Sequence, residues 1–348
     1  MSPFSRRRKN RTALYLTLLP LAVAALWWVA PLAAQTAGFV SFDAPGAGAG
    51  ENQGTVPTSI AQNGTVAGYY IDSSNLAHGF LRSPAGLITE FDPPGSTNNS
   101  VAGINQRGQT VGSGYTSSWV GFLRNADGTF VSISVPGAAD TYPVGINDGG
   151  EIAGSFINAS QTWYGFVRNT AGKYTVFGVP GASTLSGNGT LVYGINGNGA
   201  VTGYYNDKAG FAHGFVRDSL GHFASFDPPN ANGTLATAIN SNGDVTGYYG
   251  DSYYAERGFF RDAAGHISVF GVPNSVSTFV NGMNDAGVIV GKWRNSSYVD
   301  YGFEREASGL AKFSASPPDS TTVFGINNTG QITGYYVDAG GVLHGFVK

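Results

Sequence analysis

Short apolar segments recur along the chain at a nearly constant interval. Each copy follows the pattern Ile-Asn-x-x-Gly-x-Val-x-Gly-Tyr-Tyr, then a variable loop, Gly-Phe-x-Arg and an apolar run that ends at Pro. The first apolar residues of the copies are Ile60, Ile104, Ile146, Ile195, Ile239, Met283 and Ile326, with spacings of 44, 42, 49, 44, 44 and 43. This period predicts seven copies of one supersecondary unit, numbered here as repeats one to seven.

Turn residues divide each repeat into four short strands. In repeats two to seven an Asn stands three residues before a Gly, as in Asn105 and Gly108, whereas repeat one has Ala61 in place of the Asn. Asn caps a turn with its side chain and Gly accepts a positive φ, so this spacing is typical of a hairpin. A further Gly follows each arginine or its equivalent in repeats one to six, as Gly86 follows Arg82, and predicts a second hairpin.

The third strand of each repeat is apolar on both of its faces. One face carries a phenylalanine in every repeat: Phe80, Phe122, Phe166, Phe215, Phe259, Phe303 and Phe346. The next residue is also apolar, except for Glu304 in repeat six. A strand buried on both sides needs a neighbouring sheet on each side, as in blades stacked around an axis.

The two ends of the chain complement each other. The seventh repeat ends at Lys348 without a fourth strand, and residues 39–45 match residues 88–94, which form the fourth strand of repeat one. We therefore predict an all-β fold, a single seven-bladed β-propeller over residues 38–348 with four-stranded blades. Residues 39–43 should complete the last blade by pairing antiparallel with residues 343–347, whereas an open β-solenoid is the alternative.

The first 37 residues have the pattern of a targeting segment. Five basic residues between Arg6 and Arg11 precede an uncharged apolar run, residues 13–34, which ends in small residues. We interpret residues 1–37 as a signal peptide and expect a secreted, cell-surface or periplasmic protein. The run is long enough to span a bilayer, so an uncleaved anchor is the alternative and the one expected contact with a membrane.

Charge and cysteine content exclude several classes of function. Without residues 1–37 the chain has 14 basic and 22 acidic side chains, a net charge of 14 − 22 = −8. Such a surface does not favour nucleic acid as a partner. The chain has no cysteine, which excludes a thiol nucleophile and cysteine-ligated zinc. We expect a monomer without a cofactor.

The repeats resemble the exported bacterial HAF extracellular repeats. The resemblance rests on the recurrent Gly-Ile-Asn with its following glycine, and on His-Gly-Phe beginning at His78, His213 and His344. Gly stands here where that family has a central Ala. The resemblance covers residues 39–348 and implies an exported repeat protein, but it carries no catalytic residue to this chain.

Residues present in most repeats are interpreted as structural, because a site needs a few groups that converge on one point. The cations after each third-strand phenylalanine, such as Arg82, should bond neighbouring carbonyls or Asp43, Asp92 and Asp227. His78, His213 and His344 share one repeat position and are not expected to meet at a metal. Four aspartates after the aromatic pairs are expected to cap Asx-turns and not to bind calcium: Asp72, Asp207, Asp251 and Asp338.

The loops between the second and third strands and between successive repeats vary, and binding residues usually lie on such loops. They hold our candidate ligand-binding residues, Trp119, Trp163, Tyr253, Tyr254 and Tyr298, with Trp293 just before its loop. Aromatic side chains beside polar ones suit a carbohydrate or a protein ligand. The sequence thus favours a non-catalytic binding module that uses one loop face. An extracellular enzyme such as a polysaccharide lyase or hydrolase is the alternative, although no catalytic residue can be assigned.

Overall fold

The structure is a computed structural model that describes residues 38–316 and 320–348. These ranges contain 28 β-strands and no helix, and therefore no helix that could cross a membrane. The predicted signal segment, residues 1–37, lies outside the described residues. Hairpins dominate because glycines with positive φ, such as Gly108 and Gly128, form the tight turns between neighbouring strands.

Five sheets have four antiparallel strands each. Repeat two forms β6 (Asn98–Ile104), β7 (Thr110–Tyr115), β8 (Trp119–Arg124) and β9 (Phe130–Ile133). Repeat three forms β10 (Ala138–Ile146), β11 (Ile152–Asn158), β12 (Trp163–Arg168) and β13 (Tyr174–Phe177). Repeat four forms β14 (Thr190–Ile195), β15 (Val201–Asn206), β16 (Ala212–Arg217) and β17 (Phe223–Phe226). Repeat five forms β18 (Thr234–Ile239), β19 (Val245–Gly250), β20 (Glu256–Arg261) and β21 (Ile267–Phe270). Repeat six forms β22 (Ser277–Met283), β23 (Ile289–Arg294), β24 (Asp300–Glu306) and β25 (Gly309–Phe313).

The remaining strands of the described residues form one eight-stranded sheet made of repeats one and seven. Repeat one contributes β2 (Gly54–Ile60), β3 (Val66–Ile71), β4 (Ala77–Arg82) and β5 (Ile88–Phe91). Repeat seven contributes β26 (Ser320–Ile326), β27 (Ile332–Val337) and β28 (Leu343–Val347), with β1 (Val40–Phe42) paired to β28. A single parallel pair, Gly54 with Leu343, joins the two groups.

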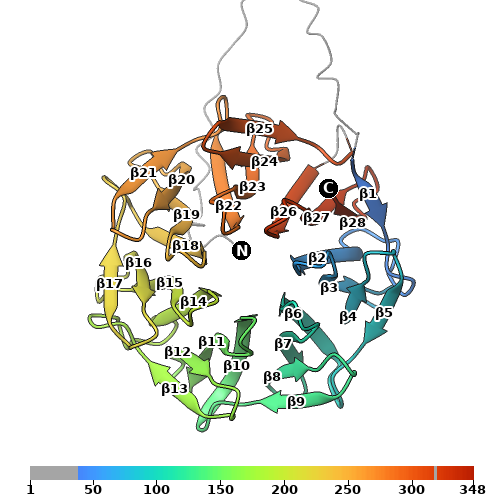
Figure 1. The fold of residues 1–348 in the computed structure, drawn as a ribbon, viewed down its shortest axis with the longest axis horizontal. Coiled ribbons are helices and arrows are strands. Elements are labelled where there is room, and N and C mark those ends of the chain that lie inside the picture. Colours follow the sequence, from blue (N-terminus) through green and yellow to red (C-terminus); the bar gives the residue numbers. More distant parts are fainter. Residues whose placement is uncertain (1–37, 317–319) are drawn as a thin grey trace, which may run out of the picture. The chain divides into compact units, whose positions relative to one another are not determined.

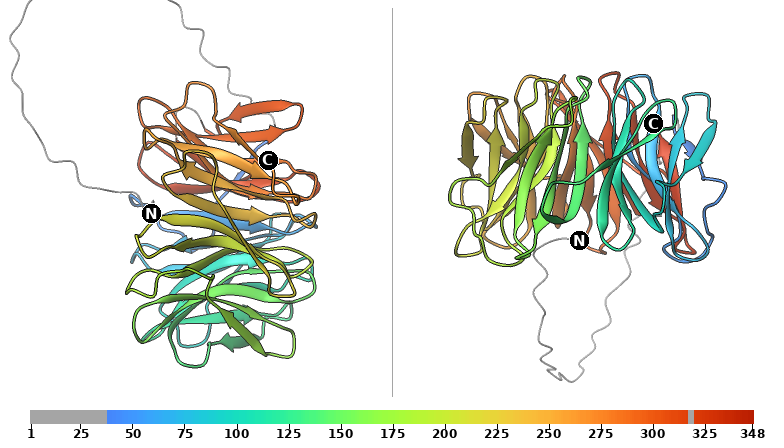
Figure 2. Two further views of the ribbon diagram at one scale, coloured as in Figure 1. Left: turned by 90° about the vertical axis from the view of Figure 1, so that its left-hand side faces the viewer. Right: turned by 90° about the horizontal axis from the view of Figure 1, so that it is seen from below.

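The sheets stand around a common axis, with the first strand of each repeat innermost (Figure 1). Antiparallel pairing places the turns on two opposite faces, as the side views show (Figure 2). The first and third turns of each repeat lie on one face, called the turn face here. The second loop and the connection to the next repeat lie on the other face, called the loop face.

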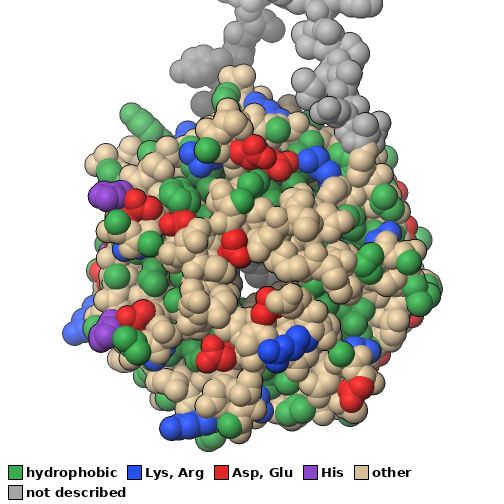
Figure 3. Space-filling model, viewed as in Figure 1, with side chains coloured by type: hydrophobic (Ala, Val, Ile, Leu, Met, Phe, Trp, Pro, Cys, Tyr) green, Lys and Arg blue, Asp and Glu red, His purple; other side chains and the backbone are tan. Residues whose placement is uncertain are grey.

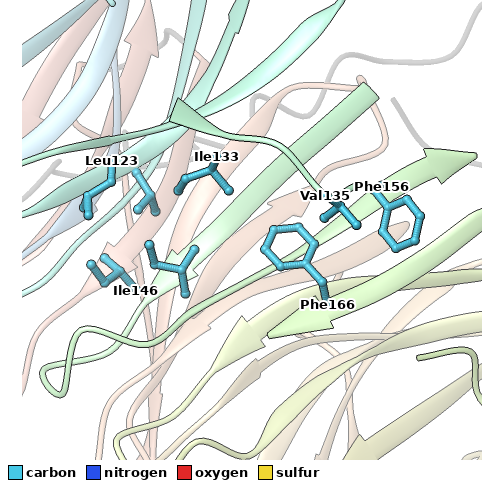
Figure 4. Close-up of a cluster of buried hydrophobic side chains, with 8 residues drawn as sticks. Leu123, Ile133, Val135, Ile146, Phe156 and Phe166 are labelled. Carbon is cyan, nitrogen blue, oxygen red and sulfur yellow. The ribbon is translucent and has the colours of Figure 1, made fainter. Parts of the chain in front are cut away.

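Apolar side chains fill the spaces between neighbouring sheets. Six of the seven third-strand phenylalanines are fully buried and Phe122 is 3% exposed, which confirms the predicted burial of this position. Between repeats two and three, Leu123 and Ile133 approach Ile146, while Phe156 and Phe166 pack beside Val135 (Figure 4). The core is therefore a series of layers between sheets, because each strand needs a neighbour on both faces.

The predicted pairing of the chain's first strand is confirmed. β1 runs antiparallel to β28, with Val40 opposite Val347, Ser41 opposite Phe346 and Phe42 opposite Gly345. Phe39 adds an edge-to-face contact with Phe346 at a centroid distance of 5.4 Å.

Asparagines of the first turns link successive repeats on the turn face. The side-chain amide of Asn105 donates to the carbonyl of Asn147, and Asn147 donates to Asn196 in the same way. Asn327 of the last repeat donates to the carbonyl of Ala61 in repeat one at 3.0 Å. Repeat one cannot continue this series because Ala61 has no side-chain donor.

The cations of the third strands confirm one part of a sequence-based expectation, the bonds to carbonyls, and correct the other, the bonds to aspartates. Arg82 and Arg217 do donate to neighbouring carbonyls, but Asp43, Asp92 and Asp227 bind histidines and not these arginines. The register explains the difference, because Arg82 stands opposite Ile88, four residues before Asp92. Six of the seven cations lie over an aromatic ring on the strand that precedes their own repeat in the chain, at 4.5 to 5.1 Å from its centroid: Arg82, Arg124, Arg217, Arg261, Arg305 and Lys348. These contacts therefore link each repeat to the strand that precedes it.

Candidate functional site

The loop face carries a continuous row of aromatic rings across repeats two and three. Tyr115 and Trp119 face each other across β7 and β8, with ring centroids 5.6 Å apart. Trp119 lies 6.2 Å from Tyr142 on β10, and Tyr142 lies 5.5 Å from Trp163 on β12. Trp119, Tyr142 and Trp163 are half-buried and Tyr115 is exposed. The structure thus brings two of the sequence-predicted residues together, and we call these four side chains the aromatic row.

Asp140 holds the aromatic row in place where the two sheets meet. Its carboxylate accepts a hydrogen bond from the backbone N–H of Trp119 at 2.8 Å, although it belongs to the next repeat. Burial and the charge of Asp140 raise the pKa of Tyr142 to about 12. Tyr142 is therefore a neutral phenol at physiological pH and can act as a hydrogen-bond donor.

Sequence reasoning missed Tyr142 because it lies on an innermost strand and not on a variable loop. A comparison of the repeats nevertheless distinguishes this tyrosine. The corresponding residues of repeats one, two and seven are Val56, Ser100 and Thr322, so a tyrosine at this position departs from those copies.

Trp293 has a packing role. Its ring stacks on Tyr301 at a centroid distance of 4.9 Å, and the ammonium group of Lys312 lies 4.5 Å from the indole centroid. It also packs against the cluster around Val280 and Phe303, between repeats five and six. Trp293 therefore contributes to the core and lies apart from the aromatic row.

Three further candidates, all tyrosines, project from the loop face on repeats five and six. Tyr253, Tyr254 and Tyr298 are 88%, 77% and 74% exposed, and within the described ranges no ring contact reaches them. Tyr254 and Tyr298 adopt φ values of 60° and 63°, where the corresponding turns of other repeats carry Asn75 or Gly210. A bulky residue in this conformation is strained. Among residues 38–316 and 320–348, no ring contact joins these three side chains to the aromatic row.

Histidine and aspartate side chains form pairs at three equivalent positions that sequence reasoning did not connect. His78 lies between Asp92, at 3.0 Å from Nδ1, and Asp72, at 3.5 Å from Nε2. His213 and His344 repeat this arrangement with Asp227 and Asp207, and with Asp43 and Asp338. The constant separation of 14 residues between His78 and Asp92 and between His213 and Asp227 was the available signal.

The aspartates raise the pKa of all three histidines. Burial alone lowers the pKa of each imidazole, but hydrogen bonds and charge from its two carboxylates outweigh this effect. Each histidine also lies against a tyrosine ring, as His78 stacks on Tyr70. Each histidine and its two aspartates lie within one sheet and link the ends of neighbouring strands.

The aspartates after the aromatic pairs cap turns, as expected. Asp72 accepts hydrogen bonds from the backbone N–H groups of Ser74 and Leu76, and Asp251 does so from Tyr253 and Ala255. Within residues 38–316 and 320–348, no cluster of three or more histidines or carboxylates is arranged to hold a metal ion.

A pocket of about 300 Å³ opens beside β7 and β8 of repeat two. Its polar side chains are Ser96, Thr116 and Ser132, and none of its lining residues is titratable. Lys348 and Glu304 form an ion pair between neighbouring repeats at 2.9 Å, but neither residue lines this pocket. The pocket therefore lacks the paired acid and base that hydrolysis or elimination of a polysaccharide would use.

The turn face carries a mixture of charged and apolar side chains. Acidic, basic and apolar side chains are interspersed on the face shown in Figure 3, with acidic side chains close to the central opening. Side chains of successive first turns bond one another here, as Gln106 does with Asp148 and Asn328 with Asp285. Few polar groups of these central turns thus remain for a ligand.

Comparison with known proteins shows the fold. No family model matches the chain, and no curated protein matches its sequence. The structure is similar to virginiamycin B lyase from Staphylococcus aureus, with 14% identity, 89% of this chain and 99% of that chain covered, and a TM-score of 0.55. It is also similar to the β-propeller domain of the Trilobed protease from Pyrococcus furiosus, with 8% identity, coverage of 84% and 95%, and a TM-score of 0.56. The described residues therefore form a β-propeller of four-stranded sheets, and identities this low say nothing of activity.

Proposed function

We propose that this chain is an exported, seven-bladed β-propeller of the HAF repeat type that binds a saccharide on its loop face without catalysing a reaction. The seven copies in the sequence support the blade count. The pairing of β1 with β28 and the hydrogen bond from Asn327 to Ala61 support a closed ring, because each joins the last repeat to an earlier part of the chain. Closure leaves no free sheet edge between the first and last repeats.

The aromatic row is the observation that carries the binding role. Trp119, Tyr142 and Trp163 form a chain of contacts across two blades, at centroid distances of 6.2 and 5.5 Å, and all three keep part of their surface exposed. Amphipathic rings in such a position offer an apolar surface together with N–H and O–H groups. The apolar C–H face of a pyranose can cover one ring while its hydroxyls bond Tyr142 and nearby loop residues.

The rigid scaffold favours a preorganised surface. Tyr142 and Trp163 lie on strands, and the backbone N–H of Trp119 is fixed by Asp140 from the neighbouring repeat. Little conformational entropy is therefore lost when a ligand binds these rings. The lyase or hydrolase alternative has no comparable support, because the described pocket has no titratable lining residue.

A glycan array followed by titration of the best saccharide tests this proposal. We expect Trp119→Ala and Trp163→Ala each to weaken binding about tenfold or more, since buried aromatic anchors dominate such contacts. Tyr254→Ala is the matched control, because it removes an exposed loop-face aromatic residue that has no ring contact with the row.

Three outcomes would contradict the proposal. They are saccharide binding that survives both tryptophan substitutions, binding lost only in Tyr254→Ala, and turnover of the bound saccharide. If no glycan on the array binds, and a polypeptide binds in a way that depends on Trp163, the same surface would be assigned to a protein ligand. That result would overturn the proposal of a saccharide ligand.

A further inference from the structure

Repeat two departs from the other six at one cross-strand pair. In the other repeats the second strand carries a large aromatic residue opposite a bulky residue of the third strand. Five of these pairs are in ring contact, with centroids 4.9 to 5.7 Å apart: Tyr70 with His78, Phe156 with Tyr164, Tyr205 with His213, Trp293 with Tyr301, and Tyr336 with His344. In repeat five Tyr249 stands opposite Arg257. In repeat two the same pair is Gly114 with Val120.

The aromatic residue normally fills the space beneath the connection from the preceding repeat. Tyr70 packs with Ala44 and Ala47 of that connection, and a Cβ on Gly46 would lie only 2.7 Å from the tyrosine oxygen. Tyr205 packs with Val179 and Ala182 in the same way. The aromatic residue of the pair therefore packs against the connection from the preceding repeat.

The pocket of about 300 Å³ lies where this pair is missing. It is lined by Gly114 and Val120 themselves and by Pro93, Pro94 and Ser96 of the connection, with Phe122 and Phe130 at its base. An apolar cavity of about 150 Å³ already binds benzene. The pocket of repeat two thus has room for a single ring and a surface suited to one.

A second departure places an unpaired acceptor beside the pocket. The residue after the connection is Thr in the other six repeats, as in Thr55 and Thr234, but it is Asn99 in repeat two. Its amide nitrogen donates to Asp92 at 2.6 Å, so its Oδ1 must point the other way. Asn99 is 2% exposed, and no donor in the described part of the chain reaches this oxygen.

Oδ1 of Asn99 points toward the space that the second-strand aromatic side chain would enter if repeat two had one in place of Gly114. A Cβ on Gly114 would lie 2.9 Å from this oxygen and 2.9 Å from Cβ of Ser96. Ser96 uses its hydroxyl hydrogen on the carbonyl of Pro93 at 2.7 Å, which leaves its lone pairs to accept a further bond. Ser96 therefore places an acceptor in the lining of the pocket, and the unpaired Oδ1 of Asn99 lies buried close to it, next to Gly114.

We propose that this pocket binds one planar aromatic ring that carries an O–H or N–H donor, the chemistry of a phenol. The ring takes the place that Tyr70 and Tyr205 fill in other repeats, against Val120 and Phe122, and its donor is directed to Asn99 and Ser96. This site lies on the opposite side of the β7–β8 hairpin from the aromatic row, because Gly114 and Tyr115 are neighbours on one strand. It is independent of the saccharide proposed above.

An NMR titration of the full chain with para-cresol tests the proposal. We expect saturable binding with a Kd of roughly 1 mM, and about tenfold weaker binding of toluene, which has the ring but no donor. A comparison with N-acetyltyrosinamide distinguishes the two sources of such a ring. Tighter binding of the amide would assign the pocket to a tyrosine of a polypeptide, and tighter binding of para-cresol to a free phenolic molecule.

Val120→Tyr should abolish the site, because repeats three and six carry tyrosine at this position. We expect para-cresol to bind at least tenfold more weakly with Tm unchanged or raised, and Val120→His serves the same purpose if that variant does not fold. Val176→Tyr on the exposed side of β13 is the control and should bind as the native chain does. Asn99→Thr should reduce the preference for para-cresol over toluene about tenfold.

Absence of saturable para-cresol binding, or binding that Val120→Tyr leaves unchanged, would overturn the site. Equal affinity for toluene and para-cresol in the native chain would overturn the requirement for a donor.

Discussion

Removing the third-strand phenylalanine of one repeat should reveal how much each layer between sheets contributes to stability. Phe166 is fully buried and packs against Ile133 and Val135 of the preceding repeat, with Tyr174 at a centroid distance of 5.8 Å. Because its surroundings are rigid β-strands that cannot collapse into the space, Phe166→Ala should reduce the free energy of unfolding by about 3–5 kcal/mol. The Tm should fall by roughly 6–10 °C.

The same substitution in repeat two provides an internal comparison. Phe122 is 3% exposed and lines the pocket beside Gly114, so part of its ring already lacks contacting atoms. Phe122→Ala should therefore cost about 1–2 kcal/mol less than Phe166→Ala. Equilibrium unfolding in urea measures both values. A cost below about 1.5 kcal/mol for Phe166→Ala, or an equal cost at both positions, would refute this reasoning.

Three further predictions concern closure and pH. Because the chain has no cysteine, Val40→Cys combined with Val347→Cys should form one disulfide on mild oxidation and raise the Tm; failure to cross-link would contradict the register of β1 and β28. Deletion of residues 38–45 should expose β28 and cause aggregation, seen by light scattering, whereas a monodisperse product would refute the role of β1 in protecting that edge. The pKa values of His78, His213 and His344 lie above 6.5, so their stabilisation is complete below about pH 6.5 and is lost as pH rises through the raised values. Unfolding free energy should thus decline as pH rises above about 6.5, and replacement of all three by Gln should flatten the curve; an unchanged decline would exclude these histidines as its cause.

Much of the fold follows from the sequence because the determining pattern is local and repeated. The burial of Phe80 and its equivalents follows from two apolar faces on one short strand, and the pairing of β1 with β28 follows from the likeness of residues 39–45 to residues 88–94. What an arginine such as Arg82 contacts could not be predicted, because Phe42 comes from a strand of the last repeat's group and the distance depends on how the strand groups pack.

The site was less accessible to sequence reasoning. Variable loops directed attention to Tyr254, which stands alone, and away from Tyr142, which connects Trp119 to Trp163 from a strand. Gly114 is visible as a departure from the repeat, but a missing side chain suggests a pocket only after the register shows what it normally faces.

The indole N–H resonances of the tryptophans provide the most direct test of the proposed binding surface. The chain has five tryptophans, of which Trp119, Trp163 and Trp293 belong to the described residues, and single substitutions assign their signals. Titration with the best saccharide from the array should shift the signals of Trp119 and Trp163 and leave that of Trp293 in place. Shifts confined to Trp293, or saturable binding that moves none of the three, would contradict the assignment of the aromatic row as the binding surface.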